Sequence, residues 1–191
     1  FIEKISNKRF NEPDIEIPVI SELDKKIKNI FNKKIITIHL SKRWKNQFYS
    51  LKNLKDLLSK LSNYDHYHIF LTTEVENDLN FIEIIKNYPI LSLNDFNNSN
   101  FIKEKELNNV IMILDGFDYE NWISVIKSSY KVITPESGCT HVAAAFKVPV
   151  TVIYNANNLP EYIYKEYSPW KCLHNKIIFN KENNVNKEIL K

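Results

Sequence analysis

Six consecutive residues, "ESGCTH" at positions 136–141, combine side chains that suit a phosphorylated ligand, and they include one of only two glycines in the 191-residue chain. Gly138 allows an anion to approach the backbone because no Cβ is in the way. A helix that begins there adds free N–H groups and its dipole, which both favour an anion. His141 follows Ser137 by four residues, on the same side of a first helical turn, and can donate to a phosphate oxygen. Glu136 does not favour phosphate and is better suited to accept hydrogen bonds from sugar or ribose hydroxyls.

The same residues also fit an ordinary structural role. Serine before a helix is common capping chemistry, and the side-chain oxygen of Ser137 can accept a hydrogen bond from the first turn. A single histidine in a first turn is more often a surface or core side chain than a ligand. Motifs of this length also arise by chance. The motif alone therefore leaves both interpretations open.

The elements around the motif predict one α/β domain, a Rossmann-like parallel sheet with helices on both faces. Continuous apolar runs alternate with amphipathic stretches, which is typical of βαβ units. One apolar run ends at Thr134, and ligands of such sheets bind beyond the carboxyl ends of the strands. The expected strands are residues 33–40, 67–73, 89–93, 108–114, 130–134, 148–154 and 176–179. The expected helices are residues 21–31, 51–61, 75–87, 118–129 and 139–147. Residues 94–106 and 160–170 are expected to be irregular. Residues 1–18 are expected to be a linker, and residues 19–191 the domain.

Composition sets the broad class of the protein. Hydrophobic residues make up 43% and charged residues 26% of the chain, as in ordinary globular proteins. The net charge of +3 is mild and the basic residues are dispersed, so charge does not separate a nucleic-acid binder from other slightly basic proteins. No nucleic-acid partner is expected. Two cysteines without a CxxC pair fit a reducing cytoplasm. The chain has no initiator Met, and we expect it to be a fragment of a longer protein.

The motif resembles the signature of glycosyltransferase family 9, the heptosyltransferases of lipopolysaccharide synthesis. In that family a strand ends in Asp-Ser/Thr-Gly-x-x-His-x-Ala-Ala, followed by a helix and a strand with Val-Pro. Here the match reads "ESGCTHVAAAFKVPVTVIY", with Glu136 in place of the aspartate. "SKRW" at 41–44 is similar to the family's basic Lys-x-Trp element after its first domain strand. The resemblance runs in order over roughly residues 33–171, but Leu40 and Asn155 stand where the family has glycines.

The resemblance implies the C-terminal half of a GT-B architecture, in which two Rossmann-like domains face each other across a cleft. That half binds the donor nucleotide, while the acceptor and the general base belong to an N-terminal domain that this chain apparently lacks. Neither a metal nor a cofactor is implied. The implied contacts to the donor phosphates are Ser41, Lys42, Arg43, Ser137, Gly138 and His141. The implied contacts to the rest of the donor are Glu136 for the sugar, Glu76 for the ribose, and Gly116 and Phe117 for the base.

Two of these assignments have structural alternatives in the sequence. The basic loop that holds Lys42 and Arg43 can also be a solvated loop with Trp44 packed on the sheet. Glu76 can equally be an acidic residue in the first turn of a helix, where the helix dipole favours it.

The function implied is inverting transfer of a sugar, with a heptose among the candidates, from a nucleotide-diphosphate sugar to a lipid-linked glycan acceptor of bacterial lipopolysaccharide or surface glycan. The implied location is the cytoplasm, with peripheral association at the inner face of the inner membrane. The chain alone is expected to bind the donor without turnover. Two alternatives stay open, a nucleotide-binding module without transferase activity and another GT-B-like nucleotide-sugar enzyme such as an epimerase. A dehydrogenase is not expected, because no GxGxxG follows the first strand.

Overall fold

The computed structural model describes residues 14–18, 22–43, 51–73, 83, 86–98, 100, 102, 107–113, 117–180 and 185–190. Within them, seven strands form one sheet in the order β3-β4-β2-β1-β5-β6-β7, and every neighbouring pair is parallel. The expected parallel sheet is therefore confirmed. The strands are β1 (Lys34–Leu40), β2 (Tyr67–Thr73), β3 (Ile90–Leu91), β4 (Val110–Ile113), β5 (Lys131–Pro135), β6 (Val150–Asn155) and β7 (His174–Phe179).

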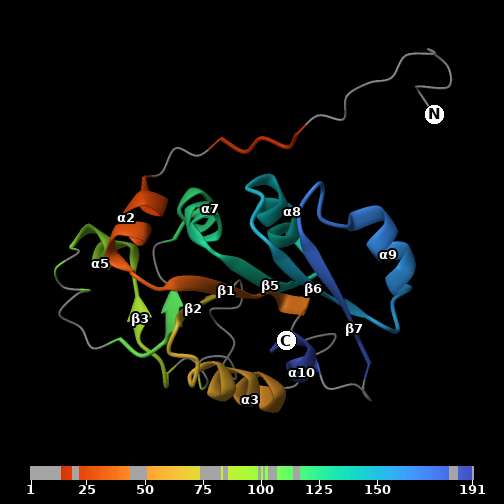
Figure 1. The fold of residues 1–191 in the computed structure, drawn as a ribbon, viewed down its shortest axis with the longest axis horizontal. Coiled ribbons are helices and arrows are strands. Elements are labelled where there is room, and N and C mark those ends of the chain that lie inside the picture. The colour runs from red at the N-terminus through yellow and green to blue at the C-terminus, as the bar shows by residue number, and fades with distance from the viewer. Residues whose placement is uncertain are drawn as a thin grey trace.

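Helices cover both faces of this sheet (Figure 1), as the sequence predicts. On one face, leucines of α3 pack with the strands and with Ile189 of α10 in one apolar cluster. On the other face, two further clusters join the strands to α2, α7 and α8. The helices are α2 (Leu23–Ile30), α3 (Leu51–Leu61), α5 (Leu93–Asn97), α7 (Tyr119–Ser128), α8 (Gly138–Ala145), α9 (Pro160–Tyr167) and α10 (Val185–Ile189).

The order of the strands reverses direction between β1 and β5. From β1 the chain proceeds to β2 and then to β3 at the edge of the sheet, and it returns to place β4 between β3 and β2. It then passes through α7 to pair β5 with the other side of β1. The register places Ile38 opposite Ile133, so both strands end at the same edge of the sheet. This arrangement is the switch point at which open parallel sheets bind ligands.

Several predicted elements differ from the structure. Residues 160–167, expected to be irregular, form α9, because Pro160 fits the first helical turn, where its missing N–H is not needed. Part of the expected loop 94–106 belongs to α5, which begins with a capping box between Ser92 and Asp95. The strand expected at 89–93 keeps only two residues, and α10 was not predicted. The linker up to residue 13 and most of the helix expected at 75–87 lie outside the described residues.

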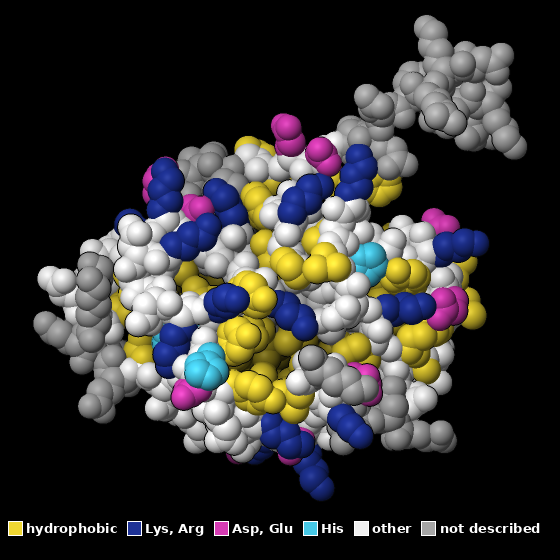
Figure 2. Space-filling model, in the orientation of Figure 1, with side chains coloured by type: hydrophobic (Ala, Val, Ile, Leu, Met, Phe, Trp, Pro, Cys, Tyr) yellow, Lys and Arg dark blue, Asp and Glu magenta, His cyan; other side chains and the backbone are white. Residues whose placement is uncertain are grey.

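The surface shows no concentration of positive charge on the face seen in Figure 2. Lys and Arg side chains are spread over that face, with acidic and apolar side chains between them. None of the helices in the described part of the chain is both long and apolar enough to cross a membrane.

His68 in β2 makes the stability of the fold depend on pH. Burial and nearby Lys33 lower the pKa of His68 from 6.5 to about 4. Its ring packs edge-on against Phe31 at 5.0 Å, and its Nδ1 has no hydrogen-bond partner among the described residues. Between pH 6.5 and 4 the unfolded chain therefore takes up a proton that the folded chain refuses.

We expect the free energy of unfolding to fall as pH decreases through this window, and His68→Gln to remove about 1 to 2 kcal/mol of that fall, after allowance for partial solvent access. Urea unfolding at pH 7, 5.5 and 4 measures it. His66→Gln is the matched control, because the His66 side chain is 88% exposed. Equal pH dependence in the two variants would contradict the assignment.

Candidate functional site

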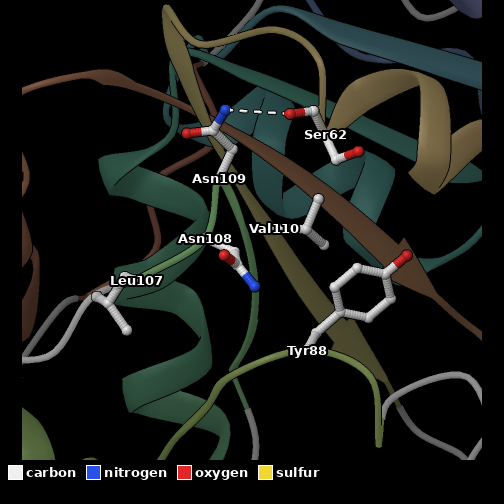
Figure 3. Close-up of a pocket in the computed structure, with 6 residues that line it drawn as sticks. All are labelled: Ser62, Tyr88, Leu107, Asn108, Asn109 and Val110. Carbon is white, nitrogen blue, oxygen red and sulfur yellow. Dashed lines mark hydrogen bonds between the residues drawn. The ribbon is translucent and has the colours of Figure 1, made fainter.

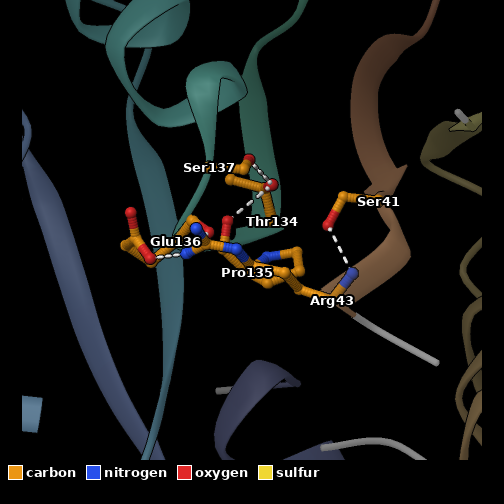
Figure 4. Close-up of polar contacts among 6 residues, drawn as sticks. All are labelled: Ser41, Arg43, Thr134, Pro135, Glu136 and Ser137. Atoms are coloured by element: carbon orange, nitrogen blue, oxygen red, sulfur yellow. Dashed lines mark hydrogen bonds and ion pairs between the residues drawn. The ribbon is translucent and has the colours of Figure 1, made fainter. Parts of the chain in front are cut away.

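The loop after β1 provides the first side of the candidate site. Ser41 is buried directly after the strand, Lys42 is exposed and Arg43 is half-buried. The backbone N–H of Arg43 donates to Ser41 Oγ at 3.3 Å (Figure 4), which begins a tight turn at this point. The buried hydroxyl thus holds the backbone of the loop at Arg43.

Arg43 joins this loop to the loop after β5. Its Nη1 donates to the backbone oxygen of Glu136 at 2.8 Å, and its guanidinium forms an ion pair with the Glu136 carboxylate. The two residues are 93 positions apart in sequence. The Glu136 side chain is 16% exposed and that of Arg43 43% exposed. The structure thus brings together two residues that the sequence assigned to one site.

The N-terminus of α8 is not closed by its own N-cap side chain. Ser137 is the N-cap residue in an extended conformation, but its hydroxyl makes no capping hydrogen bond. Instead Ser137 Oγ lies 3.1 Å from Thr134 Oγ1, which donates to the oxygen of Pro135 at 2.9 Å (Figure 4). The side-chain cap considered for Ser137 is therefore wrong, because its hydroxyl contacts that of Thr134 instead.

The backbone of Glu136 is fixed from the other side. Its N–H donates to the oxygen of Ile153 in β6 at 3.1 Å. Because β6 pairs with β5 up to Ile153, this bond holds the turn between β5 and α8 against the sheet. The position of the Glu136 carboxylate therefore depends on both neighbouring strands.

Gly138, the first residue of α8, has no packing reason to be glycine. A Cβ built on it would meet no atom within 4 Å beyond its chain neighbours and the backbone of its own helix, and its φ is outside the left-handed region. The position is exposed. The missing side chain therefore leaves the surface of the first turn open, as an approaching anion requires.

The remaining predicted residues are less closely grouped. His141 is half-buried on α8 and makes no hydrogen bond or ion pair within the described part of the chain. The ring of Phe117 packs edge-on against Phe96 of α5 at 5.9 Å, so it contributes to the core between these segments. Glu76 and Gly116 lie outside the described residues.

Two aromatic residues at this edge were not singled out from the sequence. Tyr119 opens α7, which follows β4, and is 63% exposed. Its ring lies 5.8 Å from that of Trp122, which in turn is 5.3 Å from His39 of β1. The sequence does contain a signal for these residues, because an aromatic side chain lies in the first turn of a helix that follows a strand.

Two cavities lined by described residues lie elsewhere. One, of about 520 Å³, is lined by residues at the amino end of β4, including Asn109, whose Nδ2 donates to the oxygen of Ser62 at 3.2 Å (Figure 3). The other, of about 230 Å³, lies at the amino ends of β5, β6 and β7. Both are at the edge opposite Arg43 and Glu136. No group of three or more residues able to hold a metal ion occurs in the part of the chain that the structure describes.

Comparison with known proteins shows which class of fold the domain has. No protein-family model matches the sequence, and no curated protein matches it. The fold, however, is shared with one half of glycosyltransferases of the GT-B architecture. It also matches an isolated domain, the C-terminal domain of a glycosyl transferase group 1 family protein (LpcC) from Francisella tularensis, at a TM-score of 0.50 and 13% identity, over 90% of this chain and 82% of that one.

The particular relatives include members of the family named above. A glycosyl transferase family 9 structure from Veillonella parvula matches at a TM-score of 0.59 and 12% identity, over 100% of this chain and 50% of that one. ADP-heptose lps heptosyltransferase II from E. coli matches at a TM-score of 0.59 and 13% identity, over 92% of this chain and 52% of that one. A UDP-GlcNAc 2-epimerase from Methanocaldococcus jannaschii, in complex with UDP-GlcNAc and UDP, matches at a TM-score of 0.50 and 16% identity, over 90% of this chain and 41% of that one. The chain spans about half the length of the first two structures, and the similarity establishes the fold.

Gly138→Ala tests whether the open first turn serves a ligand. Since the added methyl meets no protein atom, we expect the free energy of unfolding to stay within about 1 kcal/mol of the original. We expect the affinity for a nucleoside diphosphate to fall about tenfold or more, because the methyl occupies the space that a phosphate would use. Thermal unfolding and calorimetric titration measure the two effects. Unchanged affinity would assign Gly138 to the helix alone.

Proposed function

We propose that this domain binds the donor of a glycosyltransferase, a nucleotide-diphosphate sugar, in the crevice between β1 and β5. The observation that carries the proposal is the meeting of Arg43 with Glu136 beside the open N-terminus of α8. Cations on one loop and a helix N-terminus on the other supply what a diphosphate needs. The fold shared with family 9 structures supports the same position for the donor.

The proposed contacts to the phosphates and the sugar follow from this geometry, whereas those to the ribose and the base rest on the resemblance to family 9. Lys42 and Arg43, with Ser41 behind them, hold the diphosphate from one side, and Ser137, Gly138 and His141 hold it from α8. The Glu136 carboxylate accepts hydrogen bonds from hydroxyls of the sugar. Glu76 is assigned to the ribose, and Gly116 and Phe117 to the base.

The proposed reaction is inverting glycosyl transfer. The bond from the anomeric carbon to the diphosphate oxygen breaks, the diphosphate leaves with the electron pair, and a new bond forms to an acceptor hydroxyl, whose proton goes to a carboxylate base outside the donor site. Cations beside the diphosphate stabilise the charge that grows on this leaving group. The proposed acceptor is a lipid-linked bacterial glycan, and a heptose is one candidate sugar. Such an acceptor places the protein at the inner face of the inner membrane.

A second candidate function is nucleotide binding without transfer. Leu40 is fully buried and Asn155 ends β6, at positions where family 9 has glycines. Asn155 does support a turn, because its Oδ1 accepts from the N–H of Asn157 at 2.8 Å. A nucleotide bound there would have to approach a larger side chain. The epimerase structure that shares the fold makes another nucleotide-sugar enzyme the third candidate.

Calorimetric titration with ADP, UDP and GDP tests the proposal. We expect one of the three diphosphates to bind. We expect Lys42→Ala to make the free energy of that binding less favourable by about 1.5 to 3 kcal/mol, the range for hydrogen bonds to charged groups. Lys55→Ala is the matched control, because Lys55 is an exposed lysine on α3. His141→Ala should weaken binding in the same way.

Failure of the folded chain to bind any of the three diphosphates would contradict the proposed function. Equal affinity of the Lys42→Ala and Lys55→Ala variants would remove the loop after β1 from the site. Binding without transfer when acceptor and a complementary domain are supplied would favour the second candidate.

A further inference from the structure

The ion pair between Arg43 and Glu136 places opposite charges on the two loops of the candidate site. Arg43 comes from the loop after β1, and Glu136 directly precedes the N-cap of α8. The carboxylate side chain is 16% exposed, whereas the guanidinium side chain is 43% exposed. The arginine side chain is therefore the more accessible of the two to solvent.

A carboxylate and a phosphate compete for the same donors of an arginine. The guanidinium presents its N–H groups in a planar fork that suits either anion. In the structure this fork is directed at Glu136, through both the backbone oxygen and the carboxylate. A diphosphate at the N-terminus of α8 would compete for the same guanidinium. If it drew the guanidinium away, the carboxylate would face the diphosphate with its charge uncompensated. Like charges at such short range repel each other, more strongly where water is partly excluded.

We propose that Glu136 competes with the ligand for Arg43 and thereby makes the site discriminate between the nucleotide sugar and the free nucleoside diphosphate. The inference rests on the proposed function and deepens it. With free diphosphate, nothing compensates the released carboxylate. With the nucleotide sugar, sugar hydroxyls donate to that carboxylate, so its release costs less. Glu136 therefore weakens binding of the free diphosphate, which is the product, more than binding of the donor. When Arg43 pairs with Glu136 again, release of the product is promoted.

The test compares two substitutions that break the same ion pair. If the pair only holds the loops together, Glu136→Gln and Arg43→Gln should both weaken binding of the diphosphate. If the pair is an exchange of partners, the two should act in opposite directions. We expect Glu136→Gln to raise the affinity for the nucleoside diphosphate about five- to tenfold. We expect Arg43→Gln to lower that affinity by at least the same factor.

Glu161→Gln is the matched control. It breaks the pair of Glu161 with Lys176, at 3.0 Å between α9 and β7, and changes the net charge by the same amount. We expect its diphosphate affinity to be unchanged. If it tightens binding as much as Glu136→Gln does, the effect is one of overall charge and the inference is wrong.

A second titration compares the diphosphate with its sugar form, such as ADP-glucose, UDP-glucose or GDP-mannose, matched to the base that binds. We expect Glu136→Gln to lower the ratio of sugar-form to free-diphosphate affinity about tenfold. An unchanged ratio, or weaker diphosphate binding by both variants of the pair, would overturn the inference and leave the proposed function intact. No diphosphate binding by the unaltered chain would overturn the proposed function and, with it, the inference.

Discussion

The parallel pairing of β5 with β1 is the constraint on which the candidate site depends. β1 is central, with β2 along seven residues on one side and β5 on the other. Because all strands run in one direction, the loops that leave β1 and β5 emerge at the same edge. Residues 93 positions apart thus share a hydrogen bond, and the crossover through α7 is what makes β1 and β5 neighbours.

The polar contacts at this edge leave the start of α8 accessible. The hydroxyl of Ser137 is directed to Thr134, and the backbone of Glu136 is held by β6. An exposed glycine follows directly. The local structure is thus fixed by contacts behind the helix start, and none of them requires a side chain over its first turn.

The sequence predicts the sheet better than the partners of its side chains. Apolar runs separated by amphipathic stretches were sufficient for the parallel strands, because such strands are buried on both faces. The contact of Arg43 with Glu136 joins two loops that this architecture brings to the same edge. The hydroxyl partner of Ser137 and the packing of Phe117 on Phe96 could not be predicted, because they depend on tertiary neighbours. The helix α9 was missed because its tyrosines gave no clear apolar stripe.

The two outer strands of the described sheet have a consequence for solubility. An exposed edge of long, flat, apolar strand recruits the edge of a second molecule and starts aggregation. Here β3 contributes only two residues to one edge. At the other edge, β7 carries Lys176, whose charge is held in place by Glu161. A short strand at one edge and a lysine at the other are both features that disfavour edge-to-edge pairing of strands between copies.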